Sequence, residues 1–308
     1  MTVQSRPEIG AWLGRLRTER GYSAATLTSY AQALELLELL AEDMPWQQVR
    51  EADIRRWVAE LAREGLAPRT IAQRLSAWRG FFDFLALAHN PVRGVRGPKA
   101  PRRLPKALSP DEANRLAAHR AGEAFEAVRD KALVELFYSS GLRLAELCSL
   151  DLHYFSDGDG RSISWLERSE AQVRVTGKGG KQRSVPVGRA ALEAIDAWVA
   201  LRAAWLAERP GAESHALFIS NRGRRLARRT VQVRLARLAR GQGIASRVHP
   251  HVLRHSFASH LLQSSGDLRG VQELLGHANI ATTQVYTALD FQRLANVYDA
   301  AHPRARKR

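Results

Sequence analysis

Cysteine is nearly absent from this sequence, and long apolar runs are absent altogether. The 308 residues include a single cysteine, Cys148, so an internal disulfide framework is excluded. No stretch reaches the roughly 18 consecutive apolar residues that a bilayer-spanning helix needs. Residues 1–10 lack the basic segment and following apolar stretch of a secretion signal. These absences predict a soluble cytoplasmic protein.

Acidic residues are also scarce relative to basic ones. The chain has 31 Asp and Glu against 47 Lys and Arg, which leaves a formal net charge of +16. Such an excess favours a polyanionic partner, and nucleic acid is the usual one. A solvated basic surface is the alternative. An anionic membrane is disfavoured because the sequence shows no polybasic amphipathic helix with an exposed apolar stripe.

A group of residues suited to phosphodiester chemistry stands near the carboxyl end. It consists of His251, Arg254, His277 and Tyr286. Far upstream, Arg143 adds a second arginine. The planar fork of arginine binds phosphate oxygens in pairs and stays charged, so Arg143 and Arg254 are candidates to grip a phosphodiester. The alternatives are an Arg143–Glu146 pair, three residues apart, and a buried ion pair for Arg254.

Residues 1–90 are predicted to form a helical domain. Apolar residues recur at the i, i+3, i+4, i+7 spacing of an amphipathic helix, first at Ile9, Trp12, Leu13 and Leu16. Three more stripes of this kind follow, which predicts four helices. Arginines on the polar faces are candidate DNA contacts, with a merely solvated surface as the alternative. The candidates are Arg69, Arg74 and Arg79.

Residues 91–107 are predicted to be an extended linker. Prolines at 91, 98, 101 and 105 alternate with arginines and lysines, and proline prevents a helix here. A basic tether can follow a phosphate backbone, so that two domains clasp one duplex. Lys99 is therefore a candidate DNA contact, and an inert linker is the alternative.

Residues 108–308 are predicted to form a second domain, mainly helical with a small β-sheet. Ser109-Pro110 is typical of a helix start. Strands are expected at 162–166, 173–176 and 183–187, and helices at 189–207, 229–241, 251–264, 268–275 and 291–300. His251 and Arg254 would then share one face of a helix near its amino terminus, where anions are favoured.

A glycine-rich turn, Gly177–Lys181, separates the last two predicted strands. Glycines let such a turn approach a ligand, so Lys178 is a candidate general acid for a leaving 5′ oxygen. The turn lacks the GxxxxGK[ST] spacing of a phosphate loop and lies between strands, which argues against nucleotide hydrolysis. Lys181 and Arg183 are expected to contact phosphate.

The histidines and the cysteine do not favour a metal site. His251, His255 and His260 lie on one predicted helix, but no cysteine or carboxylate completes a ligand set and no HExxH motif is present. Cys148 lies in an apolar helical run, which is typical of a small buried side chain rather than a nucleophile. We therefore expect neither a metal nor a cofactor.

Six tyrosines compete for the role of nucleophile. Tyr286 stands in a more polar stretch just after His277. Of the others, three fit apolar helical stripes and one lies in an irregular segment: Tyr30, Tyr138, Tyr298 and Tyr154. Chemistry alone favours Tyr286 without excluding the rest.

The order of these motifs resembles the tyrosine recombinase, or phage integrase, family. The matching elements are the arginine of GLRLAEL, the lysine of GKGGK, HVLRH, LLGHANIATTQVYT and the final tyrosine. The resemblance covers nearly the whole chain and is nearest to XerC-type members, notably in residues 264–277 and 300–304. It implies a helical, SAM-like DNA-binding domain followed by an α+β catalytic domain. The terminal helix is a candidate to dock into a neighbouring subunit, with packing on its own domain as the alternative.

The resemblance also implies a role for each candidate residue. The active site would consist of Arg143, Lys178, His251, Arg254, His277 and Tyr286. Tyr286 would attack DNA and form a 3′-phosphotyrosyl bond, and Lys178 would protonate the departing 5′ hydroxyl. The arginines and histidines would hold the scissile phosphate and its transition-state charge. Because the bond energy is kept in the phosphotyrosine, neither ATP nor a metal would be needed.

Partners follow from the same resemblance. It implies a heterotetramer with a XerD-like recombinase on double-stranded DNA at a dif-type site, which resolves chromosome dimers at cell division. It also implies control by a septal DNA translocase of the FtsK type. Alternatives with the same chemistry are a phage or transposon integrase and a type IB-like topoisomerase. An alternative from another class is a catalytically silent DNA-binding regulator.

One segment departs from the family pattern. Residues 151–173 are longer than is usual between the arginine helix and the lysine hairpin, and they include the turn-rich Asp157–Gly160. We expect a longer loop or hairpin at the surface. Because this insertion shifts the register of Lys178, Lys181 is the alternative general acid.

Overall fold

A computed structural model describes residues 6–99, 107–118, 124–158, 160–177, 180–213, 215–246 and 248–275. The chain divides into two compact units, Met1–Arg103 and Leu104–Arg308, each with an apolar core of its own. The division falls inside the segment predicted to be a linker. None of the helices in these ranges is long and apolar enough to cross a membrane.

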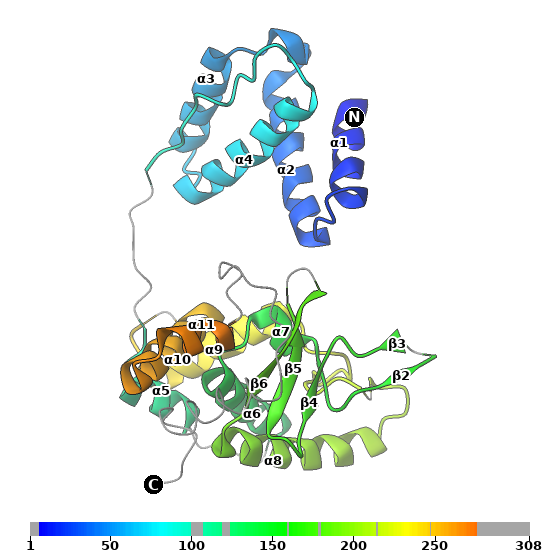
Figure 1. Ribbon diagram of the computed structural model, residues 1–308, viewed down its shortest axis with the longest axis vertical. Helices are drawn as coiled ribbons and strands as arrows, with labels where there is room; N and C mark the ends of the chain where they lie inside the picture. Colours follow the sequence, from blue (N-terminus) through cyan, green and yellow to red (C-terminus); the bar gives the residue numbers. More distant parts are fainter. Residues whose placement is uncertain are drawn as a thin grey trace. The chain divides into compact units, whose positions relative to one another are not determined.

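Four α-helices build the first unit, as the apolar stripes predict. They are α1 (Pro7–Thr18), α2 (Ala24–Ala41), α3 (Glu51–Arg63) and α4 (Pro68–Phe84), with a 3-10 turn at Trp46–Gln48 (Figure 1). The Oγ of Ser23 caps α2 by accepting a hydrogen bond from the N–H of Thr26. Proline opens both α1 and α4, where its missing N–H costs no helical hydrogen bond.

Aromatic side chains dominate the core of the first unit. The buried set consists of Trp12, Trp46, Trp57, Trp78, Phe81 and Phe82. Trp78 is fully buried, and its indole N–H donates to the carbonyl oxygen of Ala33 at 2.6 Å, which satisfies the one polar group that it brings inside. Trp12 stacks on Tyr30 with ring centroids 5.5 Å apart.

The first unit extends further along the chain than the prolines indicate. Val92 and Val95, 0% and 3% exposed, belong to its core. The side chain of Asn90 fixes the turn that brings them there, because its amide donates to Asp83 and its oxygen accepts from the N–H of Val92. Residues 91–95 therefore pack as part of the first unit, not as an extended linker.

The second unit is mainly helical with one small mixed sheet, as predicted. Its helices are α5 (Pro110–Ala117), α6 (Phe125–Ser140), α7 (Leu144–Cys148), α8 (Arg189–Ala207), α9 (Arg228–Gly241), α10 (Pro250–Ser265) and α11 (Leu268–Leu275). The sheet has the order β1 (Leu150–Asp151), β4 (Ser164–Glu167), β5 (Gln172–Thr176) and β6 (Gln182–Pro186). Strand β1, which the sequence pattern missed, runs parallel to β4, and the other neighbours are antiparallel.

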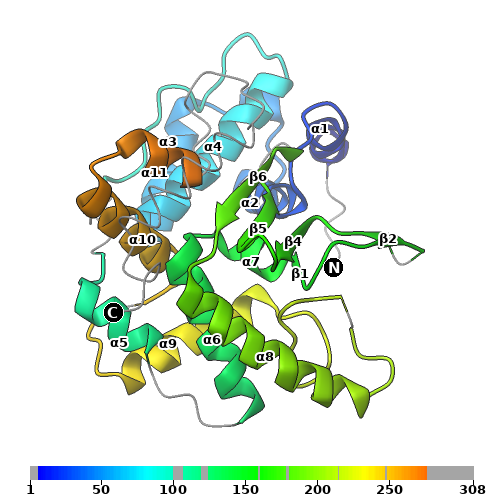
Figure 2. The same ribbon diagram turned by 60° about the horizontal axis from the view of Figure 1, so that its bottom comes forward.

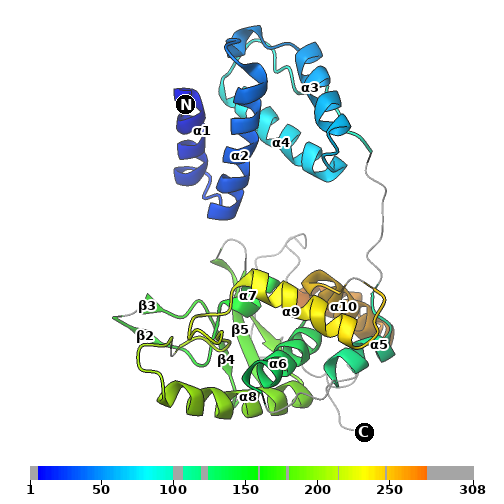
Figure 3. The same ribbon diagram turned by 180° about the vertical axis from the view of Figure 1, so that it is seen from behind.

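Helix α6 is the central element of this unit. It packs against α5, α8 and α10, and its residues from Ala132 to Ser140 are almost all buried (Figures 2 and 3). Because α6 ends at the turn that leads to Arg143, this packing fixes the position of that turn.

The inserted segment forms a surface hairpin, as expected. Strands β2 (Ser156–Asp157) and β3 (Gly160–Arg161) pair with each other alone, are fully exposed, and project from the side of the unit (Figures 1 and 3). Tyr154, 45% exposed, packs edge-on against Trp165 at the base of this hairpin.

Candidate active site

A left-handed glycine sets the position of Arg143. Gly141 ends α6 with φ of 55°, and a methyl group on it would lie 2.3 Å from Cδ1 of Phe257. Only glycine fits both the backbone conformation and the space. The chain then turns into α7, and Arg143 occupies the N-cap position with a side chain that is 40% exposed.

Arg143 pairs with Glu146, which was the alternative role considered for it. Its main-chain N–H donates to Oε2 of Glu146 and its Nη1 donates to Oε1, both at 2.8 Å. The side chain of Arg143 nevertheless keeps 40% of its surface exposed. The pair therefore orients Arg143 without removing it from the surface.

Glu146 is the buried anion of the site. Its two carboxylate oxygens also accept hydrogen bonds from Nη1 and Nη2 of Arg183, at 2.8 and 2.9 Å. Burial alone would raise the pKa of Glu146, but the hydrogen bonds and charges of Arg183 and Arg143 outweigh it and lower this pKa to about 2. Glu146 is therefore ionised at neutral pH.

The side chain of Arg183 is buried, not exposed on the surface. It is 8% exposed, and besides its two bonds to Glu146 its Nε donates to the carbonyl oxygen of Leu274. In the structure Arg183 is therefore held by Glu146 and Leu274, and a direct DNA contact for it stays a prediction. The signal for this burial was in the strand pattern, because Arg183 alternates with Val185 and Val187 on the buried face.

Arg254 lies half-buried on α10 beside this group. Its Nη1 donates to the carbonyl oxygen of Gly141 at 2.6 Å, and its Nη2 donates to that of Leu275 at 2.5 Å. Burial, followed by the positive charge of Arg143, lowers the pKa of Arg254 to about 10, so it stays charged at neutral pH. Within the described ranges these two bonds go to carbonyl oxygens, and the nearby charge of Glu146 acts on Arg254 without a direct ion pair between them.

His251 lies on the same helix, which begins at Pro250 as the sequence indicates. It is exposed in the first turn of α10, and its ring lies 6.0 Å from that of His249. His255 is also exposed, whereas His260 is buried. The three histidines of α10 therefore do not converge. No group of potential metal ligands occurs within the residues that the structure describes.

The hairpin between β5 and β6 starts beside the arginines. A methyl group on Gly177 would lie 3.7 Å from Nη1 of Arg183 and 4.0 Å from Nη1 of Arg143. The N–H of Gly177 donates to the carbonyl oxygen of Lys181, which closes the turn, and Lys181 is exposed. Lys178 itself lies outside the described residues, as do His277 and Tyr286.

The described part of the site is an arginine cluster, which we define as Arg143, Arg183 and Arg254 around Glu146. Among the described residues, the three guanidinium groups carry three positive charges around the one negative charge of Glu146. The amino terminus of α10 adds a partial positive charge near His251. A phosphodiester, with one charge and two nonbridging oxygens, fits this arrangement chemically.

The four basic candidates of the first unit and linker differ in exposure. Arg69 and Lys99 are exposed, whereas Arg74 and Arg79 are half-buried. With 3.6 residues per turn, Arg74 and Arg79 lie about 140° apart around α4, on opposite flanks of its buried stripe.

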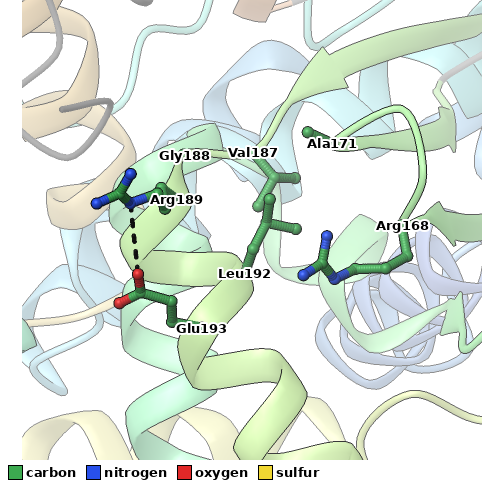
Figure 4. A pocket seen from close by; sticks show the side chains of 7 residues that line it. All are labelled: Arg168, Ala171, Val187, Gly188, Arg189, Leu192 and Glu193. Carbon is green, nitrogen blue, oxygen red and sulfur yellow. Dashed lines mark ion pairs between the residues drawn. The ribbon is translucent and has the colours of Figure 1, made fainter. Parts of the chain in front are cut away.

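A pocket of about 370 Å³ lies elsewhere in the second unit, at the start of α8 (Figure 4). Arg168, Arg189 and Glu193 surround its apolar wall. It adjoins Ala171, which precedes β5, whereas Gly177 follows β5. The pocket and the arginine cluster therefore lie at opposite ends of that strand, about 20 Å apart. Both arginines are already paired, with Asp196 and Glu193.

Cys148 fits the predicted structural role. It is half-buried, and this burial raises the pKa of its thiol to about 11 despite the opposing charges of Arg228 and Arg225. The thiol is therefore protonated at neutral pH and is a poor nucleophile. Tyr138 is fully buried on α6, as its apolar stripe predicts.

Two family models match the chain. One, described as the phage integrase family, matches residues 106–293. The other, described as the phage integrase N-terminal SAM-like domain, matches residues 9–89. The two matches correspond to the two units of the structure.

Curated relatives match over nearly their full length. Tyrosine recombinase XerC of Ralstonia pickettii (strain 12J) is 53% identical over 98% of this chain and 95% of its own. The protein of that name from Pseudomonas aeruginosa (strain LESB58) is 47% identical over 98% and 97%. Among solved structures, XerH site-specific recombinase bound to a palindromic difH substrate has a TM-score of 0.66 at 20% identity. That match covers 94% of this chain and 84% of the other, and it bears on the fold alone.

Proposed function

This chain belongs to the phage integrase family, the tyrosine recombinases, and from that premise we propose that it is a XerC-like site-specific recombinase. It cuts and rejoins DNA by transesterification, without hydrolysis and without a nucleotide cofactor. This activity fits the identity of about half the residues with XerC proteins along the whole chain.

The arginine cluster is the observation that supports this function best. Arg143 and Arg254 come from different elements, α7 and α10, yet the hydrogen bond from Arg254 to Gly141 brings them together. Glu146 accepts hydrogen bonds from both Arg143 and Arg183, and it thereby holds the guanidinium group of Arg143 in place. In the proposed reaction, the two guanidinium groups bind the nonbridging oxygens of the scissile phosphate and stabilise the charge that grows in the transition state.

The remaining roles follow the family motifs. The phenolate oxygen of Tyr286 attacks phosphorus, a 3′-phosphotyrosyl bond forms, and the bond to the 5′ oxygen breaks. Lys178 gives that oxygen its proton, and His251 and His277 hydrogen-bond the phosphate. Attack by a 5′ hydroxyl of the same or another strand then releases Tyr286. The position of Gly177 beside Arg143 supports a hairpin lysine at this site.

We propose that both units bind duplex DNA. Arg69, Lys99 and Lys181 are exposed and suited to phosphate contacts, and Arg74 and Arg79 would contact it from the flanks of α4. The partner would be a XerD-like recombinase in a heterotetramer at a dif-type site. This assembly would resolve chromosome dimers in the cytoplasm at division, under a septal translocase of the FtsK type.

A nicked suicide substrate tests the chemistry. Wild-type protein should trap a covalent adduct at the nick, and Tyr286→Phe should form none, because the attacking oxygen is missing. Tyr154→Phe, a change of the same kind at an exposed tyrosine of the insertion, should trap as much adduct as wild type. No adduct from wild type would refute the enzyme. An adduct from Tyr286→Phe would refute the nucleophile.

A second experiment tests the partner. Purified protein is mixed with a XerD-like recombinase and a dif-type duplex, and strand exchange is followed on gels. We expect exchange only when both proteins are present. Equal exchange by this protein alone would favour a single-protein integrase.

A further inference from the structure

The linker enters the second unit at a residue whose main chain is held on both sides. Leu108 is 1% exposed. Its N–H donates to Oγ of Ser256, and its carbonyl oxygen faces Nε2 of His260, both at 2.9 Å. Ser109 directly follows and caps α5 with a reciprocal pair of hydrogen bonds to Glu112. The chain is thus fixed from Leu108 onward.

The partners of His260 define its tautomer. A carbonyl oxygen only accepts, so Nε2 carries the hydrogen and donates it to Leu108. Nδ1 is then the acceptor, and the hydroxyl of Tyr138 donates to it at 3.0 Å. Burial lowers the pKa of His260, so the neutral ring that these bonds require is the stable form. Both ring nitrogens of His260 therefore take part in hydrogen bonds.

These contacts tie the linker to α10, which carries Arg254, and to α6, which leads into the turn of Arg143. Ser256 and His260 lie one turn apart on α10, which also bears His251 and Arg254. Tyr138 lies on α6, three residues before Gly141, whose carbonyl oxygen holds Arg254. Helices α6 and α10 are therefore bridged twice, once at the arginine cluster and once at Leu108.

We propose that Leu108, Tyr138, Ser256 and His260 form a linker latch, through which the linker sets the position of α10 and its phosphate-binding residues relative to α6. This inference rests on the proposed recombinase function. His260 is a positioning residue here, because it touches neither DNA nor the reacting atoms. Through the latch, a displacement of the chain at Leu108 acts directly on the helix of Arg254.

Substitutions separate the two bonds of His260. His260→Leu removes both, and we expect single-turnover cleavage of the suicide substrate at saturating protein to fall about 10- to 100-fold, since small misplacements of a binding group have effects of this size. DNA affinity should not change. His260→Gln, whose amide can still donate to Leu108, should recover most of the rate. His153→Leu and His153→Gln are matched controls at an exposed histidine of the same unit.

A double-mutant cycle tests the coupling to the linker. Inserting Gly-Ser-Gly-Ser after Lys99 lengthens the linker and should slow cleavage in wild type. In His260→Leu the same insertion should have no further effect, because the latch that conveys the displacement is already open. A purely structural role for His260 would instead give effects that multiply. Should His260→Leu fail to fold in a thermal melt, the cycle is run with Ser256→Ala, which removes the acceptor for the N–H of Leu108.

The outcomes separate this inference from the proposed function. If wild type forms no adduct, the recombinase function fails. If wild type forms the adduct and His260→Leu cleaves equally fast, or if the insertion and the latch variant act independently, the latch alone is refuted.

Discussion

The two units of this chain stabilise themselves differently. In the described residues of the first unit, the buried polar side chains are Glu38 and Asn90, and the core combines aliphatic side chains with four tryptophans and two phenylalanines. The second unit has a largely aliphatic core and buries several charged side chains within it. These include Arg129, Asp130, Glu135, Glu146, Asp151, Arg183 and Arg202.

The difference between the two cores corresponds to the side chains that each unit has to hold in position. Apolar packing has no preferred direction, and it suffices to keep four helices together. Buried ion pairs have demanding geometry and contribute little net stability compared with apolar residues, but removing one partner is costly. In the second unit such pairs hold guanidinium groups in defined orientations. Charge burial here serves position more than stability.

The largest expected effect comes from removing the buried anion. Glu146→Ala leaves the guanidinium of Arg183, 7% exposed, without its counter-charge, and should destabilise the protein by about 3–5 kcal/mol. Covalent adduct formation should be lost as well. Glu193→Ala, which breaks the exposed pair with Arg189, should cost less than about 0.5 kcal/mol. Urea unfolding measures both, and equal losses would contradict the comparison.

The matching change in the first unit removes apolar packing. Trp78→Ala should destabilise that unit by about 3–5 kcal/mol, because a large cavity forms in its core. Leu39→Ala, at a leucine that is 70% exposed, should change stability by less than about 0.5 kcal/mol. Limited proteolysis should show cleavage of Trp78→Ala confined to the first unit. Equal susceptibility of the second unit would show that the two do not fold separately.

Acid should weaken the second unit in a defined window. The pKa of Glu146 is about 2 when folded, against a usual value of 4.5. A lowered pKa contributes stability that is complete above pH 4.5 and is lost as pH falls toward 2, which corresponds to about 3 kcal/mol. Urea unfolding from pH 7 to pH 2 measures this loss. In Glu146→Gln that part of the pH dependence should vanish, and its persistence would assign the effect to other groups.

The smallest expected effect separates backbone strain from steric contact. Gly141→Ala forces a positive φ and a contact with Phe257, and should cost about 2–3 kcal/mol and slow cleavage. Gly266→Ala has the same helix-ending position, with φ of 67° and nothing near its added methyl group, and should cost about 1 kcal/mol. The difference in unfolding free energy measures the contact. Equal costs would mean that Phe257 moves aside freely.

Local patterns were sufficient for most helices and strands. The stripe of Ile71, Leu75, Trp78 and Phe82 predicts α4, and the apolar pattern predicts α8 at residues 189–207, which are its observed bounds. The short strand β1 could not be predicted, because two residues carry no periodicity and it forms only by pairing with β4. The burial of Val92 and Val95 was missed because prolines dominate that segment and packing is not a local property.

The site shows the same limit. Motifs identified Arg143, His251 and Arg254, and the structure brings the arginines together. The burial of Arg183 was not predicted, because a basic residue near a glycine-rich turn favours a surface position, while its counter-ion Glu146 lies far away in the sequence. Alternation with Val185 would have indicated an inward side chain. The placement of Lys178, His277 and Tyr286 stays a prediction.

Two arginines of the cluster donate hydrogen bonds to main-chain carbonyl oxygens. Arg254 donates to the carbonyl oxygens of residues 141 and 275, and Arg183 donates to that of residue 274. Every amino acid has a carbonyl group, so sequence drift at positions 274 and 275 leaves these acceptors in place as long as the backbone keeps its course. Substitutions at these two positions should therefore leave the arginine cluster in place, because its acceptors are main-chain atoms.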